Sequence, residues 1–195
     1  MEKLFLASGN SHKIVELRQL LRPYGVELKS TLDYPDAEEV VVDQPDLQGN
    51  ALKKARHWHK KTGLPSLSDD TGLEVEALDG APGVYSARYA GEQATYEDNT
   101  KKLLNELKTT DSRAAQFRTV IAFIDEQGDE HLFEGICRGS ITREKRGDKG
   151  FGYDPVFLPE AYDRTFAELN SEEKNRISHR GRAMAAFLEY VSKQK

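Results

Sequence analysis

The feature that most constrains the fold is a pair of long apolar stretches in the second half of the chain. They are RAAQFRTVIAFID (113–125) and EHLFEGICRGSIT (130–142), and Gln127-Gly128 lies near the turn between them. Apolar and polar residues alternate along them, which is typical of β-strands with one buried face. The two stretches therefore predict a pair of long antiparallel strands.

Strands and helices alternate in the first third of the chain. KLFLA (3–7) predicts a buried strand, and residues 26–29 predict a second one. Helices are expected between these strands, at about 50–61, at 96–107 and at 178–193, where apolar residues recur at helical spacing. An α/β start followed by a long hairpin predicts an α/β fold: an elongated mixed sheet with flanking helices and two lobes around a central cleft.

Size and composition narrow the function classes. The 195 residues predict one domain, 1–195. A net charge of −5 argues against a DNA- or RNA-binding protein, so we expect no nucleic-acid partner. The single cysteine, Cys137, excludes an intrachain disulfide and a cysteine-rich zinc site, and we expect it in the core. No run reaches the roughly 18 apolar residues of a membrane span, so we expect a cytoplasmic protein without a membrane partner.

The first motif with chemical potential is SGNSHK (8–13), a small polar loop between the first strand and the first helix. Free backbone N–H groups and the helix dipole favour an anion at such a place, and Gly9 permits close backbone approach. Lys13 lies one turn into the helix and can reach back to a phosphate. The alternative is that Asn10 or Ser11 only caps the helix. Both interpretations stay open from spacing alone.

The second motif is the doublet Asp69-Asp70, which we expect between two strands, the first ending at Ser68 and the second beginning at Leu73. Adjacent carboxylates repel each other unless a cation or hydrogen-bond donors compensate. Mg²⁺ takes oxygen ligands and often shares them with substrate phosphates. A carboxylate near a bound metal can also orient or deprotonate a water molecule. The alternative is an exposed turn, which the sequence Asp-Asp-Thr-Gly also suits.

Two later segments carry aromatic and cationic side chains. In GFGYDP (150–155), Phe151 or Tyr153 can stack on a base and Asp154 can accept from it, although a strand-entry turn with core aromatics is an alternative. His179 and Arg180 lie at a predicted helix start, where cations are disfavoured, so a phosphate or purine edge is a plausible partner. The alternative is a surface helix start that Ser178 caps. Together the motifs describe a nucleoside triphosphate site.

These motifs carry a family resemblance. From about Lys3 to Ala185 the chain resembles the inosine triphosphate pyrophosphatase family, which includes the dITP/XTP pyrophosphatases. The matching motifs, in order, are SGNSHK (8–13), NALKKA (50–55), SDDTGLEVEALDGAPGVYSARYAG (68–91), GFGYDPVF (150–157), FAEL (166–169) and SHR (178–180). The resemblance implies Mg²⁺-dependent hydrolysis of ITP, dITP and XTP to the monophosphate and pyrophosphate, a central nucleotide cleft and a homodimer.

The resemblance also implies roles for single residues. Asp70 would be the proton acceptor and a Mg²⁺ contact, with Asp69 as a weaker metal candidate. The remaining substrate-binding residues would be Ser8, Gly9, Asn10, Ser11, His12 and Lys13 for the triphosphate, and Thr71, Phe151, Gly152, Tyr153, Asp154, Lys174, His179 and Arg180 for the rest of the nucleotide. His179 and Arg180 would read the base.

One departure from the family pattern concerns the metal. The family has a metal-binding glutamate shortly before the NALKKA helix, and counting back from Asn50 puts Val42 at that place. Asp43 would serve after a shift of one residue, whereas Asp46 and Glu39 are weaker substitutes. This change motivates an alternative function, a nucleotide-binding module of the same fold with weakened catalysis.

Overall fold

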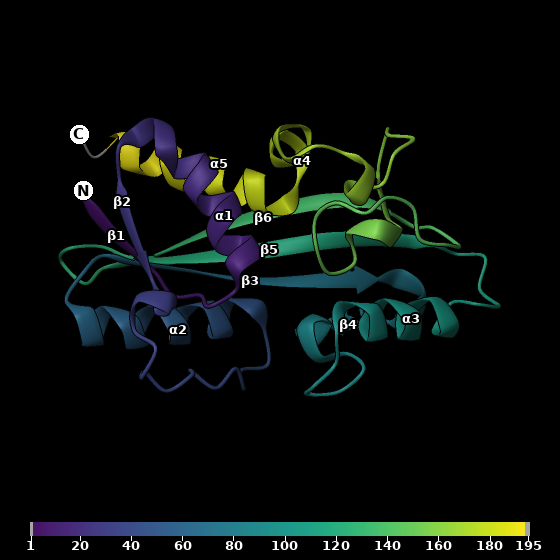
Figure 1. Ribbon diagram of the computed structural model, residues 1–195, viewed down its shortest axis with the longest axis horizontal. Coiled ribbons are helices and arrows are strands. Elements are labelled where there is room, and N and C mark those ends of the chain that lie inside the picture. Colours follow the sequence, from purple (N-terminus) through teal and green to yellow (C-terminus); the bar gives the residue numbers. More distant parts are fainter. Residues whose placement is uncertain (1, 194–195) are drawn as a thin grey trace. The chain divides into compact units, whose positions relative to one another are not determined.

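The computed structural model describes residues 2–193 and contains one seven-stranded sheet flanked by helices (Figure 1). The strand order is β2-β1-β3-β5-β6-β7, with β4 paired to β3. The strands are β1 (Lys3–Leu6), β2 (Glu27–Ser30), β3 (Ser66–Val75), β4 (Pro82–Gly83), β5 (Ala114–Ile124), β6 (Glu130–Ile141) and β7 (Phe157–Pro159). The α-helices are α1 (Ser11–Leu21), α2 (Leu47–Thr62), α3 (Tyr96–Glu106), α4 (Ser171–Ile177) and α5 (His179–Lys193).

The chain divides into two compact units. Unit 1 holds the chain up to Asp70, residues 119–134 and the segment from Ala183 onward, and unit 2 holds residues 71–118 and 135–182. Strands β3, β5 and β6 each contribute residues to both units. The predicted α/β class with a mixed sheet and flanking helices is confirmed, and the long hairpin appears as β5 and β6. The predicted cleft stays a prediction.

In unit 1, helices cover both faces of the sheet. β1 pairs in parallel with β2 and with β3. Because neighbouring side chains on a strand point to opposite faces, Leu4 and Leu6 pack with Leu17 of α1 and Phe187 of α5, while Phe5 stacks on Trp58 of α2. Figure 1 shows the same arrangement, with α1 and α5 on one face and α2 on the other. These layers hold the carboxyl end of β1 and the part of β3 that belongs to unit 1.

In unit 2, aromatic rings form the centre of the core. Phe117, Phe157 and Phe166 are buried and in mutual ring contact, and Leu103 of α3 belongs to the same cluster. β6 and β7 pair antiparallel, and a Cβ at Gly139 would lie 2.2 Å from the carbonyl oxygen of Leu158. The close pairing of these two strands therefore needs glycine at that position. Cys137 is buried as predicted, and burial raises the pKa of its thiol to about 11.

The predicted break around Asp69-Asp70 is wrong, because β3 runs without interruption from Ser66 to Val75. Gly72, which suggested a turn, instead allows β4 to approach: a Cβ there would lie 2.7 Å from the carbonyl oxygen of Gly83. The interpretation of the doublet as an exposed turn is also wrong, since Asp69 is 1% exposed.

Helix boundaries follow from local capping. Asn10 caps α1, as predicted, by accepting from the backbone N–H groups of His12 and Lys13. α2 begins three residues earlier than predicted because Asp46 caps it by accepting from Gly49 N. The short helix α4 was not predicted. Within residues 2–193, no helix combines the length and apolar character that a bilayer crossing requires.

Candidate active site

The loop before α1 is held by its own side chains. Ser8 Oγ accepts from Asn10 N at 3.2 Å, and Asn10 Oδ1 accepts from His12 N at 3.0 Å and Lys13 N at 3.3 Å. A Cβ at Gly9 would lie 3.1 Å from Thr31 Oγ1. Ser11 and His12 lie on the surface. The loop is thus an ordered cap that directs Lys13 from the first turn of α1.

Lys13 reaches the middle of β3. Its Nζ lies 3.1 Å from Asp69 Oδ2, and the Asp69 side chain is 0% exposed whereas that of Lys13 is 16% exposed. A buried carboxylate needs a close cation, so Asp69 and Lys13 hold each other in place. The two ends of this contact come from the first and second predicted motifs, which the structure brings together within unit 1.

Lys54 of α2 makes the equivalent contact with Asp70. Its Nζ donates to Asp70 Oδ1 at 3.1 Å and to the backbone oxygen of Asp69 at 2.6 Å. Ser68 Oγ donates to the carbonyl oxygen of Ala51 at 2.6 Å and ties β3 to the same helix. Lys54 was not among the predicted site residues. It lies in NALKKA, however, so its place in a motif that carries the resemblance was an available signal.

The doublet therefore carries two carboxylates and two lysines. The repulsion expected between Asp69 and Asp70 is offset by Lys13 and Lys54, one ammonium for each carboxylate. The Asp70 side chain is 14% exposed, so solvent and small ligands reach it, whereas Asp69 is enclosed. Asp70 is the carboxylate that can take part in chemistry, and Asp69 serves to anchor Lys13.

The carboxylate of Asp43 is paired with other side chains than those that contact the doublet. Its carboxylate accepts from Lys53 Nζ and from Gln44 Nε2, each at 2.7 Å, and the hydrogen bond from Lys53 lowers the pKa of Asp43. Among residues 2–193, no three His, Cys, Asp or Glu side chains are grouped closely enough to hold a metal ion. The structure thus does not bring Asp43, Asp69 and Asp70 together as one ligand set.

The residues nevertheless fit Mg²⁺ in one respect. Mg²⁺ is usually bound through one or two carboxylates together with substrate phosphates, not by a full cage of protein ligands. Asp70 offers one accessible carboxylate of this kind, whereas Asp69, its neighbour on the strand, points to the opposite face and is enclosed. The donor set therefore suits a metal that arrives with a polyphosphate.

In unit 2, a buried ion pair supports an aromatic ring. Lys174 Nζ lies 2.7 Å from Asp154 Oδ2, and both side chains are at most 6% exposed. The same Oδ2 accepts from Phe151 N at 3.0 Å, and Lys174 Nζ lies 4.9 Å from the centre of the Phe151 ring. A Cβ at Gly150, where φ is +73°, would lie 2.0 Å from Asp154 Oδ2, so only glycine fits. Three predicted residues thus form one contact group.

His179 and Arg180 are both buried, so the alternative of a surface helix start is wrong. Arg180 Nη2 donates to Thr71 Oγ1 at 3.2 Å, and its guanidinium carbon lies 5.4 Å from the centre of the Phe151 ring. The His179 ring stacks on Phe117 at 4.4 Å. Arg180 therefore joins the group around Phe151.

Tyr153 and Gly152 contribute to the shape of the loop that carries Phe151. The Tyr153 ring belongs to the hydrophobic core of unit 2, and its hydroxyl donates to the carbonyl oxygen of Ser86 at 2.7 Å. Burial raises the pKa of Tyr153. Gly152 has φ of +63°, which makes the turn between Phe151 and Tyr153 possible. The tyrosine side chain thus supports the loop from the core side.

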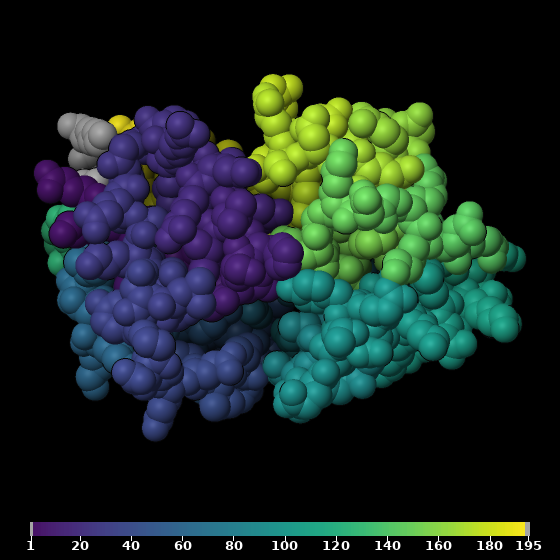
Figure 2. Space-filling model, viewed as in Figure 1, coloured from purple at the N-terminus to yellow at the C-terminus, as the bar shows by residue number. Residues whose placement is uncertain are grey.

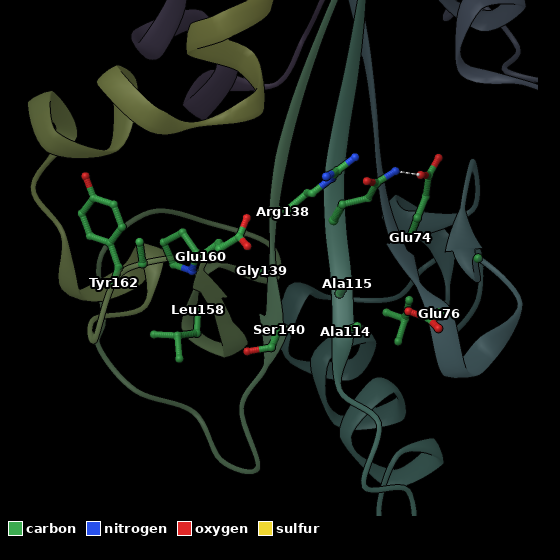
Figure 3. A pocket seen from close by; sticks show the side chains of 15 residues that line it. Glu74, Glu76, Ala114, Ala115, Arg138, Gly139, Ser140, Leu158, Glu160 and Tyr162 are labelled. Atoms are coloured by element: carbon green, nitrogen blue, oxygen red, sulfur yellow. Dashed lines mark hydrogen bonds between the residues drawn. The ribbon is translucent and has the colours of Figure 1, made fainter.

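A cavity of about 650 Å³ elsewhere in unit 2 contains none of the predicted site residues. Its lining includes short side chains of β5 and β6, such as Ala114 and Ser140, together with Glu74, Glu160 and Tyr162 (Figure 3). The size of a cavity therefore does not identify the site. The lysine–aspartate contacts of Asp69 and Asp70 and the contact group around Phe151 are the better guides.

Comparison with known proteins shows the family of the chain. Residues 4–190 match the model of the Ham1 family. A dITP/XTP pyrophosphatase of Porphyromonas gingivalis is 50% identical over 192 residues, which cover 98% of each chain. Solved structures of a HAM1 protein from Coxiella burnetii and of the Staphylococcus aureus Ham1 protein superpose with TM-scores of 0.89 and 0.88 at 40% and 36% identity, covering 99% of this chain and 100% of theirs. The resemblance predicted from the motifs is confirmed, and the chain belongs to the Ham1 family.

Proposed function

We propose that the chain hydrolyses non-canonical purine nucleoside triphosphates (ITP, dITP and XTP) to the monophosphate and pyrophosphate, and so removes them from the nucleotide pool. The observation that carries this proposal is the contact of Lys54 with the accessible carboxylate of Asp70, beside the contact of Lys13 with Asp69. The names of close relatives, dITP/XTP pyrophosphatases, support it.

The residues of unit 1 act on the phosphates. Lys13 and Lys54 present ammonium groups, and the segment from Ser8 to Lys13 binds the triphosphate at the start of α1. Asp70 accepts a proton from the water that attacks the α-phosphorus, and the bond to the β-phosphate oxygen breaks. The lysines stabilise the negative charge that moves onto pyrophosphate.

Mg²⁺ is the proposed cofactor. When bound, it neutralises charge on the phosphate oxygens and on the leaving pyrophosphate. Asp70 is the first proposed ligand, with Asp69 beside it and Asp43 as the candidate for the place of the family glutamate. Because Lys53 pairs with Asp43, this last ligand would have to exchange its partner.

The residues of unit 2 act on the nucleoside. Phe151 stacks on the base, Thr71, Gly152 and Asp154 line its surroundings, Tyr153 supports the loop, and Lys174, His179 and Arg180 supply donors. A cationic donor pairs with the 6-keto oxygen of hypoxanthine or xanthine, whereas adenine presents an amine there. With ATP a donor of the protein would meet a donor of the base, which disfavours ATP.

One assay tests the proposal: release of pyrophosphate from ITP, XTP, dITP and ATP in the presence of Mg²⁺. The expected result is turnover of ITP well above that of ATP, with the monophosphate as second product. Binding of ITP without turnover would support the alternative, a nucleotide-binding module with weakened catalysis. Release of inorganic phosphate in place of pyrophosphate would contradict the proposed bond cleavage.

The proposal also covers the domain organisation, the oligomeric state and the location of the protein. Residues 1–195 act as one catalytic domain to which both units contribute, since each unit holds part of the proposed residues. We expect a homodimer located in the cytoplasm, with neither nucleic acid nor membrane as a partner. Sedimentation velocity at micromolar concentration measures the dimer, and a monomer would contradict that part.

A further inference from the structure

The proposed base-stacking residue, Phe151, has an aromatic neighbour that no motif includes. Tyr96, the first residue of α3, lies with its ring centre 6.0 Å from that of Phe151, at an interplanar angle of 44°. This separation is within the range of attractive aromatic pairs. Tyr96 is 43% exposed, so it is a surface residue rather than part of the core.

The first turn of α3 contacts the loop around Phe151 in two further places. Lys145 Nζ forms an ion pair with Glu97, and Thr100 Oγ1 lies 3.4 Å from the carbonyl oxygen of Gly152, within hydrogen-bond range. Figure 2 shows the teal surface of α3 meeting the green surface of this loop. Three side chains near the start of α3, those of Tyr96, Glu97 and Thr100, thus contact the segment 145–152.

The start of α3 is itself well fixed. Thr95 and Asp98 form a capping box, in which each side chain accepts from the backbone N–H of the other residue. The helix is anchored in the core of unit 2 by Leu103. A rigid helix start next to Phe151 therefore provides a fixed support for its ring, which Lys174 and Arg180 approach as cations.

We propose that Tyr96 is a positioning residue for nucleobase binding: it holds the Phe151 ring in the orientation in which a purine stacks on it. This inference rests on the proposed function, because it takes Phe151 as the residue that contacts the base. Tyr96 acts only on the nucleoside end of the substrate, and through its ring, not through its hydroxyl.

The experiment measures steady-state kinetics for ITP and calorimetric binding of IMP and of pyrophosphate to wild type, Tyr96→Ala, Tyr96→Phe and Phe151→Ala. Tyr96→Ala is expected to raise KM for ITP and Kd for IMP about threefold to tenfold, the effect of losing one aromatic pair, with kcat and pyrophosphate affinity unchanged. Tyr96→Phe keeps the ring and should restore wild-type values. Tyr85→Ala, at a tyrosine of unit 2 that is 58% exposed, is the matched control.

A double variant separates positioning from a direct contact. If Tyr96 acts through Phe151, Tyr96→Ala adds no further loss of IMP affinity in the Phe151→Ala background. Unchanged IMP affinity in Tyr96→Ala, with a loss in Phe151→Ala, would overturn this inference and leave the proposed function standing. Absence of IMP binding by the wild type would overturn both.

Discussion

Two of the lysine–aspartate pairs, Lys54–Asp70 in unit 1 and Lys174–Asp154 in unit 2, differ in their access to solvent. In unit 1, the Lys54 and Asp70 side chains are 16% and 14% exposed, whereas in unit 2 those of Lys174 and Asp154 are 6% and 4% exposed, with aromatic rings against the lysine. An accessible pair can exchange its partner for a ligand, while a buried pair is costly to separate. In the proposed function, unit 1 accordingly carries out the chemistry and unit 2 holds a preformed base site.

The largest expected effect concerns the accessible carboxylate. Asp70→Asn removes the proposed proton acceptor while keeping nearly the same shape, so kcat for ITP should fall about 10³-fold, the usual range for a lost general base. The thermal midpoint should stay close to that of the wild type, because the side chain is partly exposed. Measured kcat within a few-fold of wild type would remove Asp70 from this role.

Breaking the buried Lys174–Asp154 pair is expected to lower the free energy of unfolding. Lys174→Met leaves Asp154 as a buried charge without its cation, which costs about 3–5 kcal/mol of unfolding free energy. Urea unfolding measures this loss. The double variant Asp154→Leu, Lys174→Met removes both charges and should recover most of it. A single variant as stable as wild type would show that the pair is not a fixed support.

Substitution of Lys54 tests whether the accessible Lys54–Asp70 pair acts in catalysis. Lys54→Met removes a donor next to Asp70 and should lower kcat for ITP about 10²-fold, the usual cost of one stabilising donor. Lys60→Met is the matched control, since Lys60 is an exposed lysine of the same helix. Equal losses in the two variants would argue for a general effect of charge, not for a role specific to Lys54.

The smallest expected effect concerns the second metal ligand. Asp43→Ala should shift the Mg²⁺ titration of activity toward higher concentration by a few-fold, and Mn²⁺ binding observed by electron paramagnetic resonance should weaken in parallel. Glu39→Gln, at another exposed carboxylate of the same segment, is the comparison. A shift in Glu39→Gln alone would move the ligand to that residue.

The two units also differ in how much of their structure could be predicted from the sequence. The strand and helix pattern of unit 1 follows from apolar spacing, and Asn10 was recognisable as a cap from its residue type. The continuity of β3 could not be recognised from the sequence. Gly72 is needed there because the backbone of Gly83, which is distant in sequence, approaches closely. Likewise, the burial of Arg180 and the contact of Lys54 with Asp70 depend on tertiary packing, which residue type and spacing alone do not reveal.

The most direct test of this division is the ratio of kcat/KM for ITP to that for ATP in wild type, Lys54→Met and Arg180→Gln. Lys54→Met should lower both values in proportion and keep the ratio, because unit 1 acts on phosphates that the two substrates share. Arg180→Gln should lower the ratio, because it removes the cationic donor to the 6-keto oxygen and introduces an amide oxygen that can accept from the amine of adenine. A ratio that changes in Lys54→Met and is preserved in Arg180→Gln would contradict the account.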